Sequence, residues 1–544
     1  MKTYQLFLLS LLSGLLLTCA WFPNGLVPLL FIAFVPLLIV EDTIFKNPQQ
    51  YKSLILFACS FVAFFTWNVL VTWWVKNASV GGAAMAIICN TLLMTAVFMM
   101  FHKVKKRIGG QWGILVFISF WITFEFLHLD WDLTWPWLTL GNAFADTPNW
   151  IQWYEFTGVF GGSLWVLVVN CLVFSTFRFP SSNGVENSMT GSASKTKIIG
   201  ITILITLPII ISFIMIPFIK EPTGKHVNVV IVQPNIDPYN EKFIDGFEEQ
   251  LNKMLQMGVQ KTDSTTDYLI FPETALTENL WEEQITQSSS IGILKHYLKS
   301  FPKLKIIIGA STAKVYKQGE SLSATARKFT NDDAFYDAYN TAMQLDSTGI
   351  IQIYHKSKLV PGVEKMPFPF VFKYFGKLAI DLGGTIGSLG VQDERTVFVS
   401  KDSAMRTAPV ICYESIYGEY VADYVNNGAQ FISIITNDGW WDDTPGYIQL
   451  LKYGGLRAIE TRRYIARSAN VGVACIIDHK GEIQQPTQYG VPAVIKGEII
   501  LNDELTFYTQ FGDYIARCAM YLSMFLIVYS WIISFRIIKK RVNS

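Results

Sequence analysis

The longest apolar runs of the chain lie in its first 220 residues and in a short stretch near its end. A helix of about 20 apolar residues spans the hydrocarbon core of a bilayer. Runs of this kind occur eight times, at roughly 4–22, 26–41, 53–75, 80–101, 112–128, 154–176, 196–219 and 515–535. The pattern therefore predicts an integral membrane bundle of about eight α-helices.

The first run has a second interpretation, because Lys2 followed by an apolar core also resembles a secretory signal peptide. Such a peptide is cut after small residues, whereas this run ends at Trp21-Phe22-Pro23 and shows no evident cleavage site. We favour an uncleaved helix, joined to the second run by a tight turn at residues 22–25.

Between the seventh and eighth runs, short apolar and β-branched stretches of strand length replace the long runs. They begin near Val227, Asp267, Lys305, Ala338, Ile350, Ala408, Gln430 and Val471. Helical patterns fall between them, at about 243–260, 289–300, 415–427 and 446–468. Strands that alternate with helices and are apolar on both faces indicate an α/β layered sandwich. The predicted domains are a seven-helix transmembrane bundle at 1–219, the α/β domain at 220–514, and a last helix with a basic tail at 515–544.

Lys and Arg are unevenly distributed over the predicted loops. The loop after the fourth run and the tail after the eighth are basic, with Lys103, Lys105, Lys106, Arg107, Arg536, Lys539, Lys540 and Arg541. The loop between the fifth and sixth runs contains neither residue type. Basic loops stay in the cytoplasm. If all eight runs span, both termini are cytoplasmic, residues 220–514 lie outside the cytoplasm, and 180–197 form a flexible cytoplasmic loop.

The composition agrees with a membrane protein, since 51% of the residues are hydrophobic and only 16% are charged. A net charge of +1 argues against a nucleic-acid partner, which favours a basic surface. The seven cysteines show no CxxC pair and no zinc-ligand spacing, and only Cys412 and Cys475 lie in the α/β domain. We therefore expect no disulfide framework, no metal and no cofactor.

Three predicted strand ends carry polar residues that a packed core would not select. They are Glu273 in FPET, Lys356 in YHKSK and Cys412 in ICYE. A thiol attacks as its thiolate, and its ordinary pKa of about 8.5 requires a base or a cation nearby. A carboxylate in an apolar pocket is a suitable base. A lysine, together with the amide of Tyr413, is suited to stabilise an oxyanion.

Each of these residues also has an ordinary structural interpretation. Glu273 can be a solvated loop carboxylate, Lys356 a surface lysine, and Cys412 a small buried hydrophobe. His355 is not the base if Lys356 points to the site, because neighbours on a strand face opposite sides. Polar residues at three strand ends together favour a nucleophilic site.

The same motifs resemble the Glu–Lys–Cys pattern of the nitrilase, or carbon–nitrogen hydrolase, superfamily. The membrane helices, together with TWPWLTLGN at 134–142, TNDGWW at 436–441 and LRAIETRRYIARSANVG at 456–472, narrow the resemblance to the apolipoprotein N-acyltransferase family. The resemblance covers nearly the whole chain. It implies that the α/β domain is a nitrilase-like αββα sandwich.

The resemblance also implies roles for individual residues. Glu273 would be the general base, Lys356 would stabilise the tetrahedral intermediate, and Cys412 would carry the acyl group. The positions implied to support catalysis or to bind substrate are Glu364, Tyr413, Glu414 and Trp440.

The implied activity transfers a fatty acyl chain from a phospholipid to the α-amino group of the S-diacylglyceryl-cysteine of a lipoprotein, by a ping-pong mechanism. The implied partners are a phospholipid donor, a diacylglyceryl-apolipoprotein acceptor and the membrane, without a cofactor. The implied location is the bacterial inner membrane, with the catalytic domain in the periplasm. A membrane-tethered amidase and an inactive scaffold or lipid transporter remain alternatives. The transporter is disfavoured because Glu125 is almost alone as a charge within the apolar runs.

Two positions depart from the family's pattern. Leu450 stands where many members have a histidine, and the arm after the first strand lacks the tryptophan of some members. The nearest aromatic residues on that arm are Tyr239 and Phe243. These departures concern substrate entry and leave the three catalytic assignments unchanged. An ion-paired helix face is an alternative reading of Arg457, Glu460 and Arg463.

Overall fold

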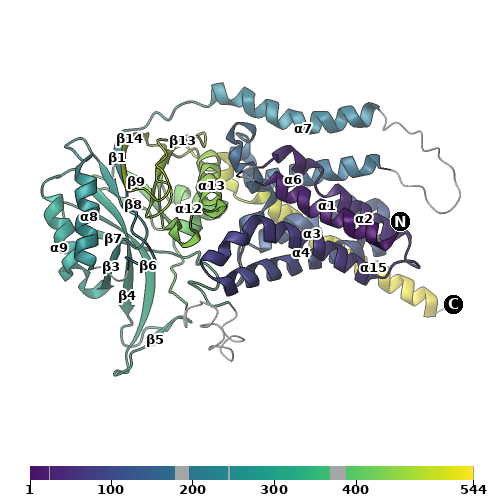
Figure 1. The fold of residues 1–544 in the computed structure, drawn as a ribbon, viewed down its shortest axis with the longest axis horizontal. Helices are drawn as coiled ribbons and strands as arrows, with labels where there is room; N and C mark the ends of the chain where they lie inside the picture. The colour runs from purple at the N-terminus through teal and green to yellow at the C-terminus, as the bar shows by residue number, and fades with distance from the viewer. Residues whose placement is uncertain (22, 24, 178–194, 243–245, 368–387, 543–544) are drawn as a thin grey trace. The chain divides into compact units, whose positions relative to one another are not determined.

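The computed structural model describes residues 1–21, 23, 25–177, 195–242, 246–367 and 388–542, the last seven of them by backbone alone (Figure 1). These residues form two compact units. The helical unit comprises Met1–Trp73, Ala83–Phe218 and Asp513–Ser544, and the sandwich unit comprises Trp74–Gly82 and Ile219–Gly512. Phe243 and most of segment 180–197 lie outside the described residues.

Among its described residues, the helical unit contains eight helices that, with their adjoining 3₁₀ turns, are long and apolar enough to cross a membrane. They are α1 (Thr3–Ala20), α2 (Val35–Lys46), α3 (Ser53–Thr72), α4 (Val80–Ile108), α5 (Gly113–Leu127), α6 (Tyr154–Thr176), α7 (Lys195–Met215) and α15 (Tyr514–Val542). The predicted number of membrane helices is therefore confirmed. The second run differs in detail, because a 3₁₀ turn at Val27–Phe31 precedes α2. Pro36 lies in the first turn of α2, where a missing N–H costs no helical hydrogen bond.

Two buried acidic side chains of the helical unit, Glu125 and Glu41, have polar partners. Glu125 accepts hydrogen bonds from the indole N–H of Trp121 at 3.1 Å and the backbone N–H of Leu140 at 2.8 Å. Glu41, in the middle of α2, contacts the Lys105 ammonium and lies 2.7 Å from His102. Glu41 was not expected from the sequence, because the predicted second run stopped at that residue.

The first sheet of the sandwich unit has eight strands. They are β1 (His226–Gln233), β2 (Tyr268–Ile270), β3 (Leu276–Trp281), β4 (Lys305–Val315), β5 (Arg327–Lys328), β6 (Phe335–Asp346), β7 (Ile351–His355) and β14 (Ala493–Ile500). The main strand order is β14-β1-β2-β4-β6-β5, while β3 pairs with β4 and β7 with β6. The apolar side chains of β1, β2 and β4 pack with those of α8 (Phe247–Val259) and α9 (Ser289–Leu298) in one buried core.

The second sheet has six strands in the order β13-β12-β11-β10-β9-β8. They are β8 (Phe398–Val399), β9 (Arg406–Ile411), β10 (Phe431–Thr436), β11 (Ile465–Ala469), β12 (Cys475–Ile477) and β13 (Ile483–Gln484). Figure 1 shows α8 and α9 outside the first sheet, and α12 (Gly418–Asn426) and α13 (Pro445–Thr461) outside the second. The short helix α14 (Phe507–Phe511) completes the unit. The predicted αββα sandwich is confirmed.

The predicted helix at 446–468 is too long. Helix α13 ends at Thr461, because Arg462 adopts a left-handed conformation with φ 52° and ψ 41°. The following residues form β11, which pairs in parallel with β10. The strand predicted to begin near Val471 begins later, because Cys475 is the first residue of β12.

Residues Trp74–Gly82, between α3 and most of α4, belong to the sandwich unit. The Trp74 ring meets the Trp441 ring edge to face, with centroids 4.9 Å apart. The Asn77 side chain donates a hydrogen bond to the Trp441 carbonyl at 3.1 Å. A Cβ at Gly446 would lie 2.6 Å from the Trp74 ring, so only glycine fits under this indole.

Candidate active site

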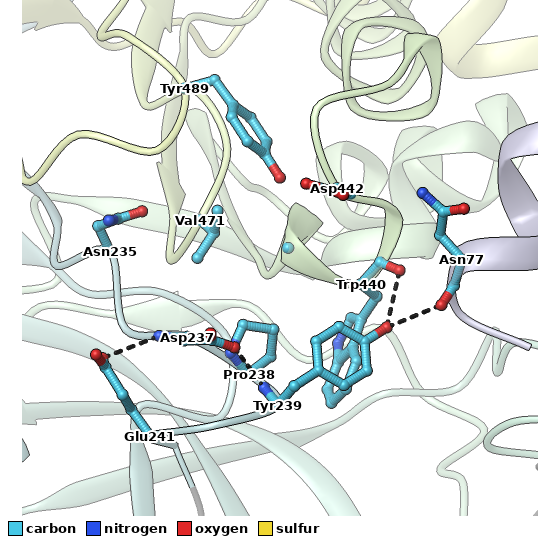
Figure 2. Close-up of a pocket in the computed structure, with 11 residues that line it drawn as sticks. Asn77, Asn235, Asp237, Pro238, Tyr239, Glu241, Trp440, Asp442, Val471 and Tyr489 are labelled. Atoms are coloured by element: carbon cyan, nitrogen blue, oxygen red, sulfur yellow. Dashed lines mark hydrogen bonds between the residues drawn. The ribbon is translucent and has the colours of Figure 1, made fainter.

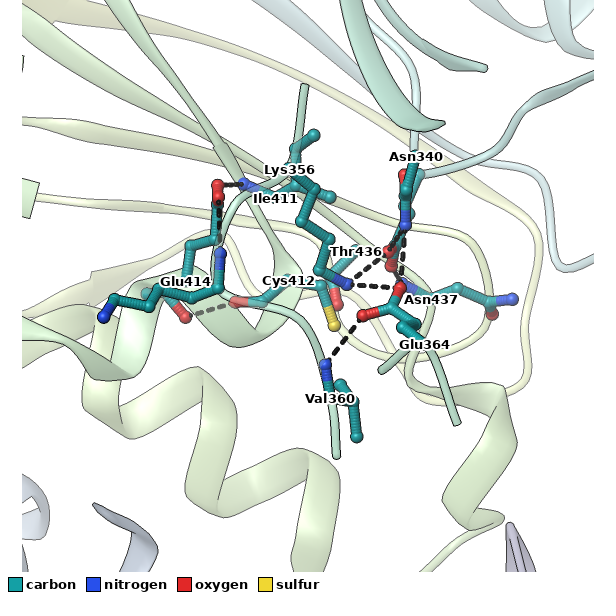
Figure 3. A network of polar contacts seen from close by, with 12 residues as sticks. Asn340, Lys356, Val360, Glu364, Ile411, Cys412, Glu414, Thr436 and Asn437 are labelled. Atoms are coloured by element: carbon teal, nitrogen blue, oxygen red, sulfur yellow. Dashed lines mark hydrogen bonds and ion pairs between the residues drawn. The ribbon is translucent and has the colours of Figure 1, made fainter. Parts of the chain in front are cut away.

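The three residues proposed for the chemistry follow three strand ends. Glu273 lies in the loop after β2, Lys356 comes directly after β7, and Cys412 directly after β9. The sequence predicted that Lys356 lies on a strand, whereas in the structure it is the first residue after β7. Its backbone N–H still donates a hydrogen bond to the Asn340 carbonyl at 2.8 Å. Figure 3 shows the side chains of Lys356, Glu364 and Cys412 converging with that of Asn340.

Two donors hold two carboxylates together at this point. The Lys356 ammonium donates to Glu273 Oε1 at 3.0 Å and to Glu364 Oε1 at 2.8 Å. The Asn340 side-chain amide donates to the same two oxygens, at 2.8 and 3.0 Å. The other oxygen of Glu273 accepts the backbone N–H of Asn437 at 3.1 Å. These contacts leave the Glu273 carboxylate little freedom to rotate.

Burial and charge set the protonation states of this group. Burial alone would raise the pKa of Glu273, but Lys356, Asn340 and Lys242 hold it below its ordinary value. Burial alone would lower the pKa of Lys356, but the two carboxylates raise it well above the ordinary value. The pair is therefore charged at neutral pH.

The Cys412 side chain is in its thiol form in this environment. The residue is only 7% exposed, and burial first, then the negative charge of Glu273, raises the pKa of the thiol. Lys356 opposes that shift without cancelling it. A thiol that does not ionise by itself must lose its proton as it attacks, and Glu273 is a charged carboxylate close enough to influence it.

Cys412 sits at a sharp bend between β9 and a 3₁₀ turn, Cys412–Ile416. Its φ of 50° lies in the left-handed region, which costs an L-residue about 1–2 kcal/mol. The fully buried Glu414 carboxylate connects the bend to a neighbouring segment of the chain. Its Oε2 accepts the N–H of Ile411 at 2.9 Å, and its Oε1 accepts the N–H of Ser357 at 2.7 Å. Glu414 thereby ties the bend at Cys412 to the backbone beside Lys356.

Tyr413 and Trp440 lie on the turns that follow β9 and β10. The Tyr413 side chain is buried against Tyr417, with ring centroids 5.4 Å apart. The use of its amide as an oxyanion donor stays a prediction. The Trp440 ring meets Tyr239 edge to face at 5.2 Å. Among the described residues, Tyr239 is therefore the aromatic residue of the arm after β1 that packs on Trp440.

Two cavities meet at Trp440, which lines both. The first has a volume of about 660 Å³ and is lined by Lys242, Glu273, Asn340 and Glu364 among others. The second, of about 750 Å³, is lined by aromatic, acidic and amide side chains that include Asn77, Asp237, Asp442 and Tyr489 (Figure 2). Because Glu273 and Glu364 line the first cavity and not the second, we take the first cavity as the candidate active site.

Sequence reasoning missed Lys242 and Asn340. Lys242 is 4% exposed, its ammonium donates to the Glu273 carbonyl at 3.2 Å, and burial lowers its pKa to about 8. It lies on an arm without a helix or strand, so no periodic pattern marked it. Asn340 could have been found, because it is a polar residue within the apolar stretch AYNTAM of a predicted strand.

The helix carrying LRAIETRR is only partly the expected ion-paired face. Arg457 and Glu460 form a buried ion pair at 2.8 Å, whereas Arg463 donates to the carbonyls of Ala429 and Thr461. Leu450 is buried in α13 at 1% exposure. Among the described residues, no group of three or more His, Cys, Asp or Glu side chains is arranged to hold a metal ion.

Comparison with known proteins covers nearly the whole chain. Residues 13–172 match the apolipoprotein N-acyltransferase N-terminal domain, and residues 228–504 match the carbon-nitrogen hydrolase domain. The apolipoprotein N-acyltransferase of Chlorobaculum tepidum is 30% identical over 529 residues, which cover 94% of each chain. The chain belongs to the apolipoprotein N-acyltransferase family.

Other comparisons are more distant. The apolipoprotein N-acyltransferase of Geobacter metallireducens is 26% identical over 522 residues, covering 94% of this chain and 92% of that one. The crystal structure of an amidase from Nesterenkonia sp. matches 54% of this chain and 96% of its own at 14% identity, with a TM-score of 0.35. That similarity is too low to compare residues.

Membership of the apolipoprotein N-acyltransferase family makes this chain an acyltransferase of the nitrilase superfamily with membrane helices. An acyltransferase assignment over the full length disfavours the amidase and the transporter considered from the sequence.

Proposed function

We propose that this protein transfers a fatty acyl chain from a phospholipid to the α-amino group of the S-diacylglyceryl-cysteine of bacterial lipoproteins, with Cys412 as the acyl carrier. The observation that carries the proposal is the position of the Cys412 thiol, at a bend beside the charged Glu273–Lys356 pair. The family to which the chain belongs gives this arrangement its substrate class.

In the first step, Cys412 Sγ attacks an ester carbonyl carbon of the phospholipid. The thiol proton passes to the Glu273 carboxylate as the carbon–sulfur bond forms. Lys356 and the Tyr413 amide stabilise the negative charge that develops on the carbonyl oxygen. When the tetrahedral intermediate collapses, the carbon–oxygen bond breaks, and the lysophospholipid leaves as an alcohol with the proton from Glu273. Cys412 is left as a thioester.

In the second step, the α-amine of the lipoprotein attacks the thioester carbonyl and gives its proton to Glu273. The carbon–sulfur bond then breaks, and the Cys412 thiolate takes the proton back. The product is an amide with a third acyl chain. A covalent intermediate lets two bulky lipids use one cavity in turn, so the kinetics are ping-pong.

The remaining roles follow from contacts. Asn340 and Glu364 hold the Glu273–Lys356 pair, and Glu414 holds the bend at Cys412. We propose that Trp440 contacts an acyl chain, because it lines the cavity. Both substrates are membrane lipids, which fits a bundle of membrane helices in the bacterial inner membrane, with both termini in the cytoplasm and the sandwich unit in the periplasm.

Intact-mass measurement tests the mechanism. The full-length protein, incubated with phospholipid alone, should gain one acyl chain that neutral hydroxylamine removes, as it removes thioesters. Adding a diacylglyceryl-cysteine peptide should discharge the chain to the peptide amine. Cys412→Ala should gain no chain. Cys475→Ala is the matched control, because Cys475 is fully buried on β12 and should behave as wild type. An adduct that persists in Cys412→Ala would refute the proposal.

A further inference from the structure

The catalytic face of the first sheet continues beyond the residues that hold Glu273. Along β6, Tyr336, Ala338 and Asn340 alternate onto one face, because successive strand residues point to opposite sides. Asn340 is the residue that contacts both carboxylates. Arg327 on β5 is paired with Tyr336, so its side chain lies on the same face. Arg327, Tyr336 and Ala338 all line the active-site cavity.

Aromatic side chains pack beside the short strand that carries Arg327. Phe329 packs on Tyr336 at 4.7 Å and on Trp281 at 5.5 Å, between ring centroids. The Arg327 guanidinium itself donates one long hydrogen bond, of 3.4 Å, to the Ser388 carbonyl. Among the described residues this is the one hydrogen bond of the guanidinium, which leaves most of its donors available towards the cavity, in a half-buried position.

Arg327 makes no ion pair within the part of the chain that the structure describes. The nearest acidic residue of β6, Asp337, alternates onto the opposite face and accepts hydrogen bonds from Tyr316, Ser323 and Thr325. At the other end of the cavity, the charges of Glu273 and Glu364 are engaged by Lys356. The cavity wall around Arg327 is therefore positive, and a guanidinium fork suits a phosphate.

The cavity is long enough for the donor groups of a glycerophospholipid. Tyr336, beside Arg327, and Asn340 are four strand residues apart, which is roughly 13 Å between Cα atoms at about 3.3 Å per residue. The cavity that Arg327 and Asn340 both line therefore extends further than the six bonds between an sn-1 ester carbonyl carbon and the phosphorus, which span about 7 Å.

We propose that Arg327 binds the phosphodiester of the acyl donor, and so makes a phosphate-bearing lipid the preferred donor. The proposal rests on the proposed function, because it names the donor group that sits beside the reacting ester. It assigns Arg327 to the first step alone, since the phosphate leaves with the lysophospholipid.

Single-turnover acylation of Cys412 tests this with two donors, phosphatidylethanolamine and the phosphate-free ester p-nitrophenyl palmitate. Arg327→Ala should slow acylation by the phospholipid roughly tenfold to a hundredfold, the range for one charge-assisted hydrogen-bonded contact. It should leave acylation by the p-nitrophenyl ester and discharge to a diacylglyceryl-cysteine peptide unchanged. Arg327→Lys should recover part of the loss. Lys314→Ala is the matched control. Lys314 is an exposed cation on β4, opposite Asp337 in the strand register, so it lies on the face of the sheet away from Arg327.

Each other result overturns the inference. Equal slowing with both donors would mean that Arg327 only maintains the fold, and a lower melting temperature would accompany it. Slowing of the discharge step alone would place an anionic part of the acceptor at Arg327. If acylation by phospholipid is unchanged in Arg327→Ala, the role of Arg327 is refuted, and the proposed function still stands. A wild type that phospholipid does not acylate, although the p-nitrophenyl ester does, refutes both.

Discussion

Replacement of Glu414 by glutamine separates the positioning of Cys412 from the chemistry of Cys412. The carboxylate is fully buried, and its Oε2 accepts the N–H of Ile411 at 2.9 Å. Its Oε1 accepts the N–H of Ser357 at 2.7 Å and the phenols of Tyr354 and Tyr420 at 2.6 and 2.7 Å. An amide has one acceptor oxygen, and its NH₂ group cannot accept. Glu414→Gln therefore cannot satisfy both sides of the site.

The less costly orientation keeps the amide oxygen at the Oε1 position. The amide nitrogen then faces the N–H of Ile411, and a buried donor without an acceptor costs about 1–3 kcal/mol. The three remaining hydrogen bonds also lose the contribution of the negative charge. We expect a total loss of about 2–4 kcal/mol in the free energy of unfolding of the sandwich unit. Because Ile411 precedes the strained bend, we expect Cys412 to move as well.

The assay combines thermal unfolding with acylation of Cys412 by phospholipid. The melting temperature should fall by roughly 5–10 °C, given the size of the unit. Acylation should slow by about a hundredfold, as for a displacement of the nucleophile by about 1 Å. The thiol itself should still react with a small alkylating reagent, because its chemistry is unchanged.

Tyr420→Phe is the matched control. It removes one phenol donor from Glu414 and leaves the bonds to the two backbone N–H groups, so the bend stays in place and acylation should change by less than about threefold. If Glu414→Gln acylates at the wild-type rate, or if Tyr420→Phe is as impaired as Glu414→Gln, Glu414 does not act by holding the bend.

Two further predictions concern charge. Burial lowers the pKa of Lys242 to about 8, so protonation of this lysine destabilises the folded state. The destabilisation is fully present below pH 8. It fades as the pH rises towards the ordinary pKa of a lysine. Lys242→Met should therefore raise the melting temperature at pH 7, by the equivalent of about 3 kcal/mol, and by much less near pH 10; a gain that is equal at both pH values would contradict this. The distribution of Lys and Arg predicts that reporters fused at residues 190 and 350 lie in different compartments, and finding both on one side would refute the eight-span topology.

The sequence predicted the parts of the fold that depend on long patterns. Membrane helices need about 20 apolar residues each, and all eight were found in the right places. Strand β11 was missed because LRAIETRRYIARSA keeps a helix-like spacing of apolar residues past Thr461. Only the left-handed backbone at Arg462 divides it into helix and strand, and no glycine marks that position.

The candidate site was predictable where its residues follow apolar strands. Glu273, Lys356 and Cys412 stand out because each interrupts an apolar run. Lys242 and Arg327 could not be found in this way. Lys242 lies on an irregular arm, and β5 has only two residues, too few for an alternating pattern. The positions of Lys242 and Arg327 in the site depend on contacts between segments that are distant in the chain. The sequence pattern within one segment does not predict such contacts.

The grouping of Trp74–Gly82 with the sandwich limits how this protein can be divided or recombined. A soluble fragment cut at residue 219 would lack the Trp74 indole that covers Gly446. It would also lack the Asn77 carbonyl, which accepts a hydrogen bond from the Tyr239 hydroxyl. It would also lose part of the wall of the cavity beside Trp440. A chimaera that takes its sandwich from a relative would therefore need that relative's loop between α3 and α4. The two segments form one folded unit, although about 140 residues of chain lie between them.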